Sequence, residues 1–410
     1  MKGIHVKGLF GRFDYDIQLA EGSTTILTGP NGFGKSTILQ CIYAVANSDL
    51  EFFLKLDFKE IEILMLDEEE NLQIVKCQDN LVINGQEISA HDIIALKKNR
   101  MRDHPVYIME GTSGKISEKI VRRVDTGEEI VSQTIYSMCQ KIGEIRFIKE
   151  QRLIREDDQL SIRQRNRWEE PRRREVQIVD QIPLELMSQI RKASQEYSKV
   201  ANDLDSTFPQ RLFNERNKIS EEQFNQKLAV MQKKMENLQK YGISNIGKLG
   251  AVQFNEEDAR ALKVYFEDFD EKYKSYESLI KKLDMFTEIV NRKFLFKKMK
   301  ISEKELVVLD EDNPEKELAL SQLSSGEKET VVLFYQLLFD VPDNVILLVD
   351  EPEISLHVAW QREFAEDIKT VVESKGITAL IATHSPQFIN GNRGIQIDLG
   401  ELYTNGLDKK

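Results

Sequence analysis

Nine consecutive residues near the start of the chain carry the strongest chemical signal. They run GPNGFGKST from Gly29 to Thr37 and match the whole pattern G-x-x-x-x-G-K-[S/T]. The β-prone run STTILTG leads into them, and residues 36–46 follow with apolar side chains at helical spacing. A glycine-rich turn between a strand and a helix lets backbone N–H groups face an anion, and the helix N-terminus adds partial positive charge. The sequence therefore predicts a phosphate-binding loop.

The polar residues of this loop have expected roles. Lys35 should reach the β- and γ-phosphates of a nucleotide, and the Ser36 hydroxyl should bind Mg²⁺. The expected ligand is ATP with Mg²⁺. The predicted nucleotide contacts within the loop are Asn31, Gly32, Gly34, Lys35, Ser36 and Thr37.

Two acidic residues end an apolar run later in the chain. The run VILLVDE covers residues 345–351 and predicts a buried strand that ends in Asp350 and Glu351. Ligands of α/β sheets bind at the carboxyl ends of the strands. Asp350 is expected to hold the Mg²⁺ shell, and Glu351 to orient the water that attacks the γ-phosphate. Acidic residues end strands in many α/β proteins, so this assignment gains its weight from the phosphate loop.

The elements that must position these residues alternate strands and helices at both ends of the chain. Residues 1–28 predict three short strands, and the runs FFLKLDF, IEILMLD, LQIVKC and LVING between 51 and 88 predict an antiparallel meander, a β-subdomain. From about 305 a sheet-like run, ELVVLD, precedes a helix over 325–339 and the strand NVILLVD. TALIATH is an uncharged strand, typical of the middle of a parallel sheet. The pattern predicts one α/β fold divided by an insertion.

The insertion, roughly residues 182–295, is charged and mostly helical. Apolar residues recur at steps of three and four in two stretches, namely Phe224, Leu228, Met231, Met235 and Leu238, then Leu262, Phe266, Phe269, Tyr273, Tyr276, Ile280 and Leu283. With the turn-like GISNIGKLG between them, they predict an antiparallel helical hairpin, a short coiled-coil arm of about 30 to 45 Å. In the alternative interpretation, both stripes pack on the globular core.

Composition argues against several protein classes. The formal net charge of −12 argues against broad affinity for nucleic acid. The arginine-rich run between residues 163 and 174 is interleaved with glutamates, and fits either a solvated loop or a contact surface. The three cysteines are far apart, which suggests neither a disulfide framework nor a zinc site. No apolar stretch nears the roughly 20 residues of a membrane span, so we expect a soluble, cytoplasmic protein without a membrane partner.

Three further motifs, in this order and spacing, resemble those of the SMC, RecF and OLD-type ATPase heads. QLSSGE (residues 322–327) looks like the ABC signature, EPEISLH (351–357) like the D-loop, and THSP (383–386) like the switch-histidine loop. Taken singly, the serines would be a helix cap and His384 a strand-end histidine. Ser325 stands where many signatures have glycine and His357 where transporters have aspartate, and both departures fit the OLD-like branch better.

This resemblance implies an α/β fold, a P-loop NTPase of ABC (SMC, RecF, OLD head) type with an antiparallel β-subdomain and an inserted α-helical hairpin. It also implies a division into three regions. Residues 1–181 would form the N-terminal lobe, 182–300 the inserted helices, and 301–410 the C-terminal lobe.

The resemblance also implies that two heads sandwich two ATP molecules. Ser324 and Gly326 of one subunit would then contact the γ-phosphate that Lys35 of the other subunit holds. His384 would sense the γ-phosphate, and Gln151 would meet the metal ion and the attacking water. The implied signature contacts are Ser324, Ser325, Gly326 and Glu327. The implied catalytic residues are Glu351, His384 and Gln151, and the implied metal ligands are Ser36, Asp350 and Gln151.

A narrower resemblance concerns the runs GRFDYDIQL, TILTGPNGFGKST, LSSGE, DEPEISLHVAWQ and ATHSPQFI. Together they look like stand-alone ATPase subunits of bacterial antiphage defence, the AriA type of PARIS and the PtuA type of Septu. Such subunits form homo-oligomers around a separately encoded effector, such as a Toprim or HNH nuclease or a toxin, and respond to a phage trigger.

The resemblance therefore implies an ATPase subunit that controls another protein. The 26 residues after His384 are too few for the Toprim domain of OLD nucleases, and the five histidines are scattered. We therefore expect no nuclease domain in this chain. The alternative from a different class is a RecF- or SMC-like DNA-repair ATPase with DNA as its partner.

Overall fold

The computed structural model describes residues 1–67, 70–94, 143–149, 153–156, 175–243, 253–354, 358–385 and 396–407. The chain forms two compact units, of which the first combines Met1–Glu150 with Val341–Lys410 and the second is Gln151–Asp340. Residues 301–340 therefore belong to the second unit. The sequence-based domain boundaries at 181 and 300 stay a prediction.

A parallel sheet is the centre of the first unit. In spatial order its described strands are β16 (Gln396–Asp398), β3 (Thr24–Thr28), β15 (Thr378–Ala382), β14 (Ile346–Asp350) and β8 (Ile145–Ile148). The prediction that TALIATH lies in the middle of a parallel sheet is confirmed, since β15 pairs with β3 on one side and β14 on the other. Because all these pairs are parallel, the carboxyl ends of β3, β14 and β15 meet at one edge.

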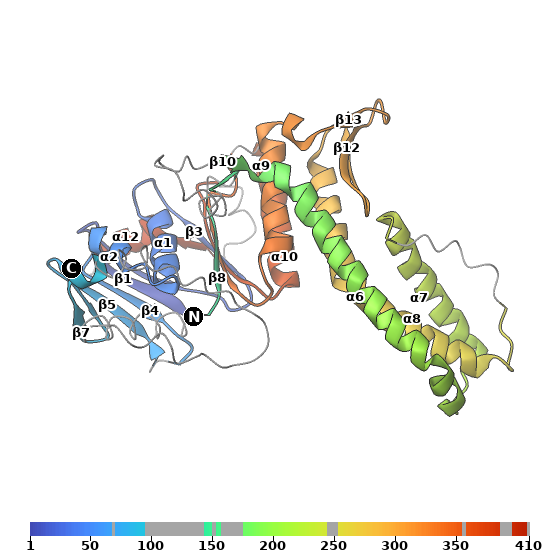
Figure 1. Cartoon of the computed structure of the whole chain (residues 1–410). Helices are drawn as coiled ribbons and strands as arrows, with labels where there is room; N and C mark the ends of the chain where they lie inside the picture. The colour runs from blue at the N-terminus through green and yellow to red at the C-terminus, as the bar shows by residue number, and fades with distance from the viewer. Residues whose placement is uncertain are drawn as a thin grey trace, which may run out of the picture. The chain divides into compact units, whose positions relative to one another are not determined.

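Three helices follow strands of this sheet. Helix α1 (Lys35–Ala46) comes directly after the glycine-rich turn and packs on β14, β15 and β8. Helix α10 (Val358–Ser374) connects β14 to β15, and α12 (Leu399–Leu407) packs on β2 and β3. Figure 1 shows α1 beside the blue strands. The apolar face of α1 explains its place, because Ile38, Leu39 and Ile42 are fully buried.

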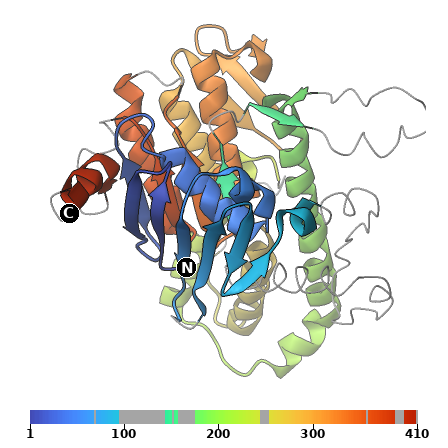
Figure 2. The same cartoon turned by 90° about the vertical axis from the view of Figure 1, so that its left-hand side faces the viewer.

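An antiparallel sheet completes the first unit. In spatial order its strands are β2 (Phe13–Gln18), β1 (Gly3–Leu9), β4 (Glu60–Leu64), β5 (Leu72–Cys77), β6 (Asn80–Ile83) and β7 (Gln86–Ile88). They lie side by side in Figure 2, with the blue lightening from β1 and β2 toward β7. The alternation of buried and exposed residues in β2 is the pattern of a sheet with one face on the core. The predicted β-subdomain is confirmed.

The first run of the predicted meander is a correction. FFLKLDF was expected to be a strand, but residues Leu50–Lys55 form helix α2. Asp49 caps this helix, since its carboxylate accepts a hydrogen bond from the Phe52 N–H at 3.3 Å. A local N-cap here outweighs the strand preference of two adjacent phenylalanines.

The second unit is built on three long helices. They are α6 (Ile178–Asn214), α7 (Glu221–Lys240) and α8 (Ala259–Lys293). Helix α8 has 35 residues, so it is about 52 Å long at about 1.5 Å per residue. The two apolar stripes found in the sequence pack on each other. Their buried members include Phe224, Met231 and Phe266.

The predicted antiparallel hairpin of these two stripes is wrong. Contacts between α7 and α8 advance in the same direction along both helices. They join Phe224 to Phe266, Lys234 to Asp270 and Tyr241 to Asp284. The two helices are therefore parallel. Heptad spacing shows which helix face is apolar, but it does not give the direction of the partner.

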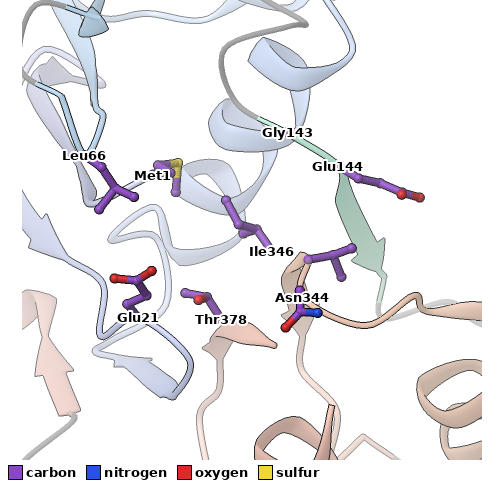
Figure 3. A pocket seen from close by; sticks show the side chains of 9 residues that line it. Met1, Glu21, Leu66, Gly143, Glu144, Asn344, Ile346 and Thr378 are labelled. Atoms are coloured by element: carbon purple, nitrogen blue, oxygen red, sulfur yellow. The ribbon is translucent and has the colours of Figure 1, made fainter. Parts of the chain in front are cut away.

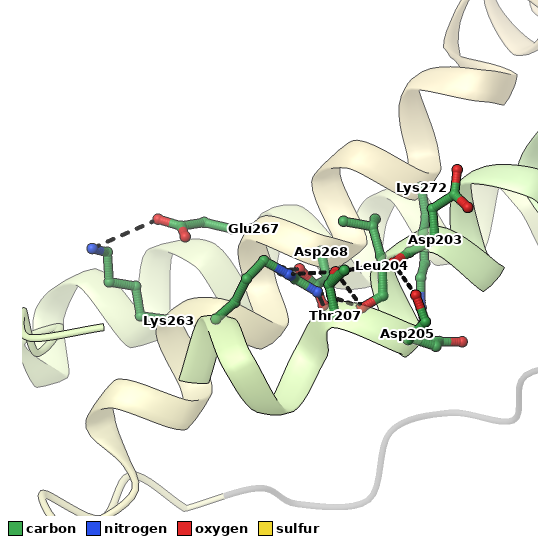
Figure 4. Close-up of polar contacts among 10 residues, drawn as sticks. Asp203, Leu204, Asp205, Thr207, Lys263, Glu267, Asp268 and Lys272 are labelled. Carbon is green, nitrogen blue, oxygen red and sulfur yellow. Dashed lines mark hydrogen bonds and ion pairs between the residues drawn. The ribbon is translucent and has the colours of Figure 1, made fainter. Parts of the chain in front are cut away.

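The antiparallel partner of α8 is α6, as three contacts that advance in opposite directions along the two helices show. Tyr197 stacks near Tyr276, whereas Asp205 near the end of α6 accepts a hydrogen bond from Lys272 at 2.7 Å. Farther along, Arg211 forms a two-bond ion pair with the buried Asp268. Figure 4 shows Asp205, Lys272 and Asp268 along this contact.

The remaining described elements of the second unit are short strands, one further helix and the turns beside it. A small antiparallel sheet contains β11 (Lys297–Ile301), β12 (Leu306–Asp310) and β13 (Glu317–Leu318), and β9 (Ile154–Glu156) pairs with β10 (Glu175–Gln177). A 3-10 turn, Leu320–Gln322, then leads to α9 (Ser325–Tyr335) and a π-helical turn, Gln336–Asp340. The predicted helix over 325–339 therefore begins where expected and widens in its last turn.

Candidate functional site: a nucleotide site at the sheet edge

The turn between β3 and α1 lies at the carboxyl edge of the parallel sheet. Gly32 and Gly34 have φ angles of +84° and +90°, which favour glycine. At Gly34 space is also limiting, since a Cβ atom there would lie 2.8 Å from Leu9 Cδ2. The tight turn brings Lys35 to the start of α1, as a phosphate-binding loop requires.

Lys35 points toward the residues that follow β15. The residue is 4% exposed. Its ammonium donates to the Gly29 carbonyl at 3.0 Å and lies 2.6 Å from His384 Nε2. Burial lowers the pKa of Lys35, and nearby carboxylates, led by Glu351, act in the opposite direction. A cation held this way is suited to a polyanion such as a triphosphate.

Ser36 and Asp350 provide oxygen ligands for a metal ion. The Ser36 hydroxyl donates to Asp350 Oδ1 at 2.9 Å, although 314 positions separate the two residues. Mg²⁺ prefers oxygen ligands and takes few of them from protein when phosphates and water supply the rest. The described residues contain no cluster of three His, Cys, Asp or Glu side chains suited to a metal. This pair fits a Mg²⁺ ion that arrives with a nucleotide.

Glu351 has the backbone of a strained site. Its φ angle is +44°, a region that residues other than glycine seldom adopt and that costs about 1 to 3 kcal/mol. A hydrogen bond from the Glu351 N–H to the Ala382 carbonyl, at 2.9 Å, holds this conformation. Burial, and then the charge of Glu353, raises the pKa of Glu351 to about 8. A carboxylate that titrates near neutral pH can accept a proton or a hydrogen bond from water.

His384 lies between Lys35 and Glu351. Its Nε2 atom is 3.2 Å from Glu351 Oε1, and its backbone N–H donates to Glu351 Oε2 at 3.2 Å. Burial, and then the charge of Lys35, lowers the pKa of His384. The imidazole is therefore neutral at pH 7. Lys35, Glu351 and His384, which follow three separate strands, thus converge at one place. The roles predicted for these three residues require this proximity.

One protein family matches most of the chain. The family described as "AAA ATPase domain" matches residues 1–389. The chain belongs to this family. No curated protein matches it.

Several solved structures are similar to this ATPase domain. One is an Smc head domain with an extended coiled coil bound to the C-terminal domain of ScpA from Pyrococcus furiosus. It has 14% identity and a TM-score of 0.38, over 95% of this chain and 90% of that one. Another is the SMC head domain from Thermotoga maritima, with 11% identity and a TM-score of 0.35, over 95% and 90%. A third is an Smc head domain with a coiled coil and joint from Pyrococcus yayanosii. It has 13% identity and a TM-score of 0.35, over 95% of this chain and 93% of that one.

The predicted signature residues lie in the second unit of the ATPase domain. Ser324 is the N-cap of α9, which confirms the helix-cap interpretation of the serines. Its N–H and hydroxyl donate to Glu327 Oε2 at 2.8 and 2.9 Å, and Lys297 Nζ lies 2.9 Å from both Glu327 oxygens. Burial raises the pKa of Glu327, but Lys297 and Ser324 outweigh it, so this pKa lies below its ordinary value. Ser324 and Ser325 are exposed, whereas Gly326 is buried.

Some predicted features lie outside the described residues. They are Gln151, the run 163–174, D-loop residues 355–357 and Pro386. Their roles stay predictions. Within the described part of the chain, no helix is both long and apolar enough to cross a membrane.

Sequence reasoning missed two contacts of the site. The Tyr15 hydroxyl of β2 donates to the carbonyl of Phe33 in the phosphate loop at 2.9 Å. Glu353, which follows Asp350 by three residues, is buried and bonds the His384 loop. The acidic side chain in DEPE was a visible signal for Glu353, whereas nothing in the local sequence links Tyr15 to the loop.

A cavity of about 190 Å³ lies elsewhere in the first unit. Figure 3 shows Glu21, Glu144, Asn344 and Thr378 around it. These residues lie before or at the start of β3, β8, β14 and β15. The cavity is therefore at the amino edge of the parallel sheet, and the nucleotide site is at the opposite edge.

Proposed function

We propose that this chain binds Mg-ATP and hydrolyses it. The observation that carries the proposal is the convergence of Lys35, Glu351 and His384 at the carboxyl edge of the parallel sheet, beside the glycine-rich loop. Membership in an ATPase domain family supports it. Mg-ATP would supply the scissile phosphoanhydride bond, and the metal would neutralise part of the charge on its phosphates.

Each residue has a role that its geometry allows. N–H groups of Asn31, Gly32 and Gly34 and the start of α1 bind the phosphates, and Lys35 contacts the γ-phosphate. Ser36 and Asp350 hold the metal ion. Glu351, as a carboxylate, accepts a hydrogen bond from the attacking water and aligns it. His384 is within reach of both Lys35 and Glu351, so it would also contact the γ-phosphate.

We further propose that two copies of the chain complete two ATP sites. In each site, Ser324 and Gly326 of one copy contact the γ-phosphate held by Lys35 of the other. Two features support this arrangement. Ser324 and Ser325 are exposed, and they lie at the N-terminus of α9, where the helix dipole favours an anion. Gln151 would join the metal ion and the water.

In this function, ATP binding and hydrolysis by the chain control the activity of another protein. The ATP-linked dimer, or a larger homo-oligomer built from it, would act as sensor and scaffold for a separately encoded nuclease or toxin in antiphage defence. The resemblance of the phosphate-loop, signature and DEPEISLH runs to such subunits motivates this step. The net charge of −12 agrees with a protein partner better than with general affinity for nucleic acid.

Steady-state ATP hydrolysis tests the proposal. The purified chain is assayed with and without duplex DNA, with Glu351→Gln as the matched blank, and the mass in solution is measured by light scattering with and without ATP. We expect turnover in the wild type, a loss of about 100-fold or more in Glu351→Gln, and an ATP-bound dimer trapped by that variant. Equal turnover in both proteins contradicts the role of Glu351. Stimulation of about tenfold by DNA, or about 1.4 kcal/mol of barrier, would favour the DNA-repair ATPase instead.

A further inference from the structure

Glu353 is a buried carboxylate beside the proposed catalytic residues. It follows β14 in the sequence Asp350-Glu351-Pro352-Glu353 and is 7% exposed. A buried carboxylate without partners is costly, so the groups that bond it reveal what it does.

One oxygen of Glu353 collects three donors from three consecutive residues. Oε1 accepts the Thr383 hydroxyl, the His384 N–H at 3.0 Å and the Ser385 N–H at 3.0 Å. All three donors lie in the loop that follows β15. A carboxylate suits this arrangement, because hydrogen bonds to a charged acceptor are about twice as strong as neutral ones.

The same loop is fixed from a second side. The Ser385 hydroxyl donates to Gln361 Oε1 on α10 at 2.7 Å, and the Ser385 N–H also contacts the Thr383 hydroxyl at 2.9 Å. Residues on both sides of His384 are therefore held, while its imidazole is left to contact Lys35 and Glu351.

We propose that Glu353 is a positioning residue for ATP hydrolysis, which acts by fixing the backbone of His384. The proposal rests on the proposed function. The Thr383 N–H still bonds the Leu27 carbonyl of β3 at 3.1 Å, but the next two N–H groups, of His384 and Ser385, bond side chains and share Glu353 Oε1 as an acceptor. Contacts of 2.6 and 3.2 Å at His384 Nε2 tolerate little displacement. A shift of about 1 Å in a catalytic group can cost about 100-fold in rate.

The test separates a hydrogen-bond role from a charge role. Glu353→Gln keeps an acceptor oxygen for the three donors and removes the charge, whereas Glu353→Ala removes both. For Glu353→Ala we expect kcat for ATP to fall by about 100-fold with KM changed less than about threefold. Glu353→Gln should lose less than about tenfold, because neutral hydrogen bonds are weaker but still present. A Gln variant as slow as the Ala variant overturns the hydrogen-bond role, as does an Ala variant at the wild-type rate.

A double-mutant cycle tests whether Glu353 acts through His384. If it does, Glu353→Ala combined with His384→Ala should be no slower than His384→Ala alone. Additive losses would overturn the proposal. Glu366→Gln, an exposed carboxylate on α10, is the control, and thermal unfolding of each variant checks its fold.

A spectroscopic measurement keeps the proposal testable even if the chain hydrolyses no ATP. With five histidines, ¹⁵N-labelled imidazole signals can be assigned by single substitutions. The His384 signal should shift in Glu353→Ala and stay near its wild-type position in Glu353→Gln. An unchanged signal in Glu353→Ala overturns the positioning role, whereas absent hydrolysis in the wild type overturns the proposed function alone.

Discussion

Buried charges have different surroundings at the sheet edge and in the helical unit. At the end of β14, three carboxylates, Asp350, Glu351 and Glu353, are buried within four residues, close to the single positive charge of Lys35. In the helical unit the buried Asp268 faces both Nη atoms of Arg211, and the buried Glu327 faces Lys297. Each of these two buried carboxylates of the helical unit is thus paired with one cation.

This difference distinguishes a ligand-binding site, at the end of β14, from ion pairs that stabilise the helical unit. Burial, and then the like charge of Glu353, raises the pKa of Glu351, and the same residue has a strained backbone. Such an arrangement persists where a further charged group, such as a metal ion with phosphates, completes it. Matched pairs such as Arg211 with Asp268 need no ligand, so they fix helix register instead.

Removal of Lys35 should have the largest effect at the sheet edge. We expect Lys35→Ala to weaken ATP binding by about 100-fold or more, because it leaves the phosphates without their buried cation. Isothermal titration with a non-hydrolysable ATP analogue measures this. Lys7→Ala is the control, since Lys7 is an exposed lysine of the same unit that pairs with Glu60 at the surface. Similar ATP affinities for Lys35→Ala and Lys7→Ala would contradict the role of the sheet edge as the ATP site.

Asp268→Asn should destabilise the helical unit without changing ATP affinity. It leaves the Arg211 guanidinium without its counter-charge, and because that side chain is about one-third exposed we expect a cost of about 2 to 3 kcal/mol. Urea unfolding followed by circular dichroism gives the value. Asp205→Asn removes the exposed partner of Lys272 and should cost less than about 0.5 kcal/mol. Equal costs would show that burial does not distinguish these pairs.

Lys297→Met should have a smaller effect on stability and a specific effect on turnover. It removes the cation that holds Glu327, which bonds Ser324, so we expect a loss of about 1 to 2 kcal/mol and slower hydrolysis. ATP binding to the isolated chain should stay unchanged, because Lys35 is untouched. The exposed neighbour Lys298 on the same strand provides the matched control, Lys298→Met. If Lys297→Met hydrolyses ATP at the wild-type rate, the Glu327 contacts that cap α9 are not needed for the proposed signature function of Ser324.

The pH dependence of stability should show the smallest effect when it is expressed per pH unit. The pKa of Glu351 is about 8 in the folded chain and about 4.5 when unfolded, so the unfolded state loses its proton first. The Glu351 contribution to stability is complete below about pH 4.5 and is lost as pH rises through 8. Without magnesium or nucleotide, wild-type stability should therefore fall relative to Glu351→Gln across this window. Between the two pKa values each pH unit should lower the relative stability by up to about 1.4 kcal/mol, and the raised pKa already includes the opposing effect of Lys35. Parallel pH profiles of the two proteins would contradict the raised pKa.

Local sequence was sufficient for the elements with a strong local signal. Strands β1, β2 and β3, helix α1 and the cap at Ser324 lie where periodicity and motif spacing placed them. Prediction from local sequence failed where a distant or competing contact decides the secondary structure or the packing direction. Asp49 turned a phenylalanine-rich run into α2, and the direction of α7 along α8 depends on packing that no heptad encodes.

The sequence by itself determined the chemistry of this protein, because a phosphate loop is local: its glycines, Lys35 and Ser36 are consecutive and need only a strand before them and a helix after. Tertiary structure alone decided how that chemistry is assembled. Lys35 meets His384 across 349 positions and Ser36 meets Asp350 across 314, because parallel strands align their carboxyl ends at one edge whatever their separation in the chain. Tertiary structure also showed that Glu353 holds the His384 loop, since its three donors come together only after β14 and β15 have paired.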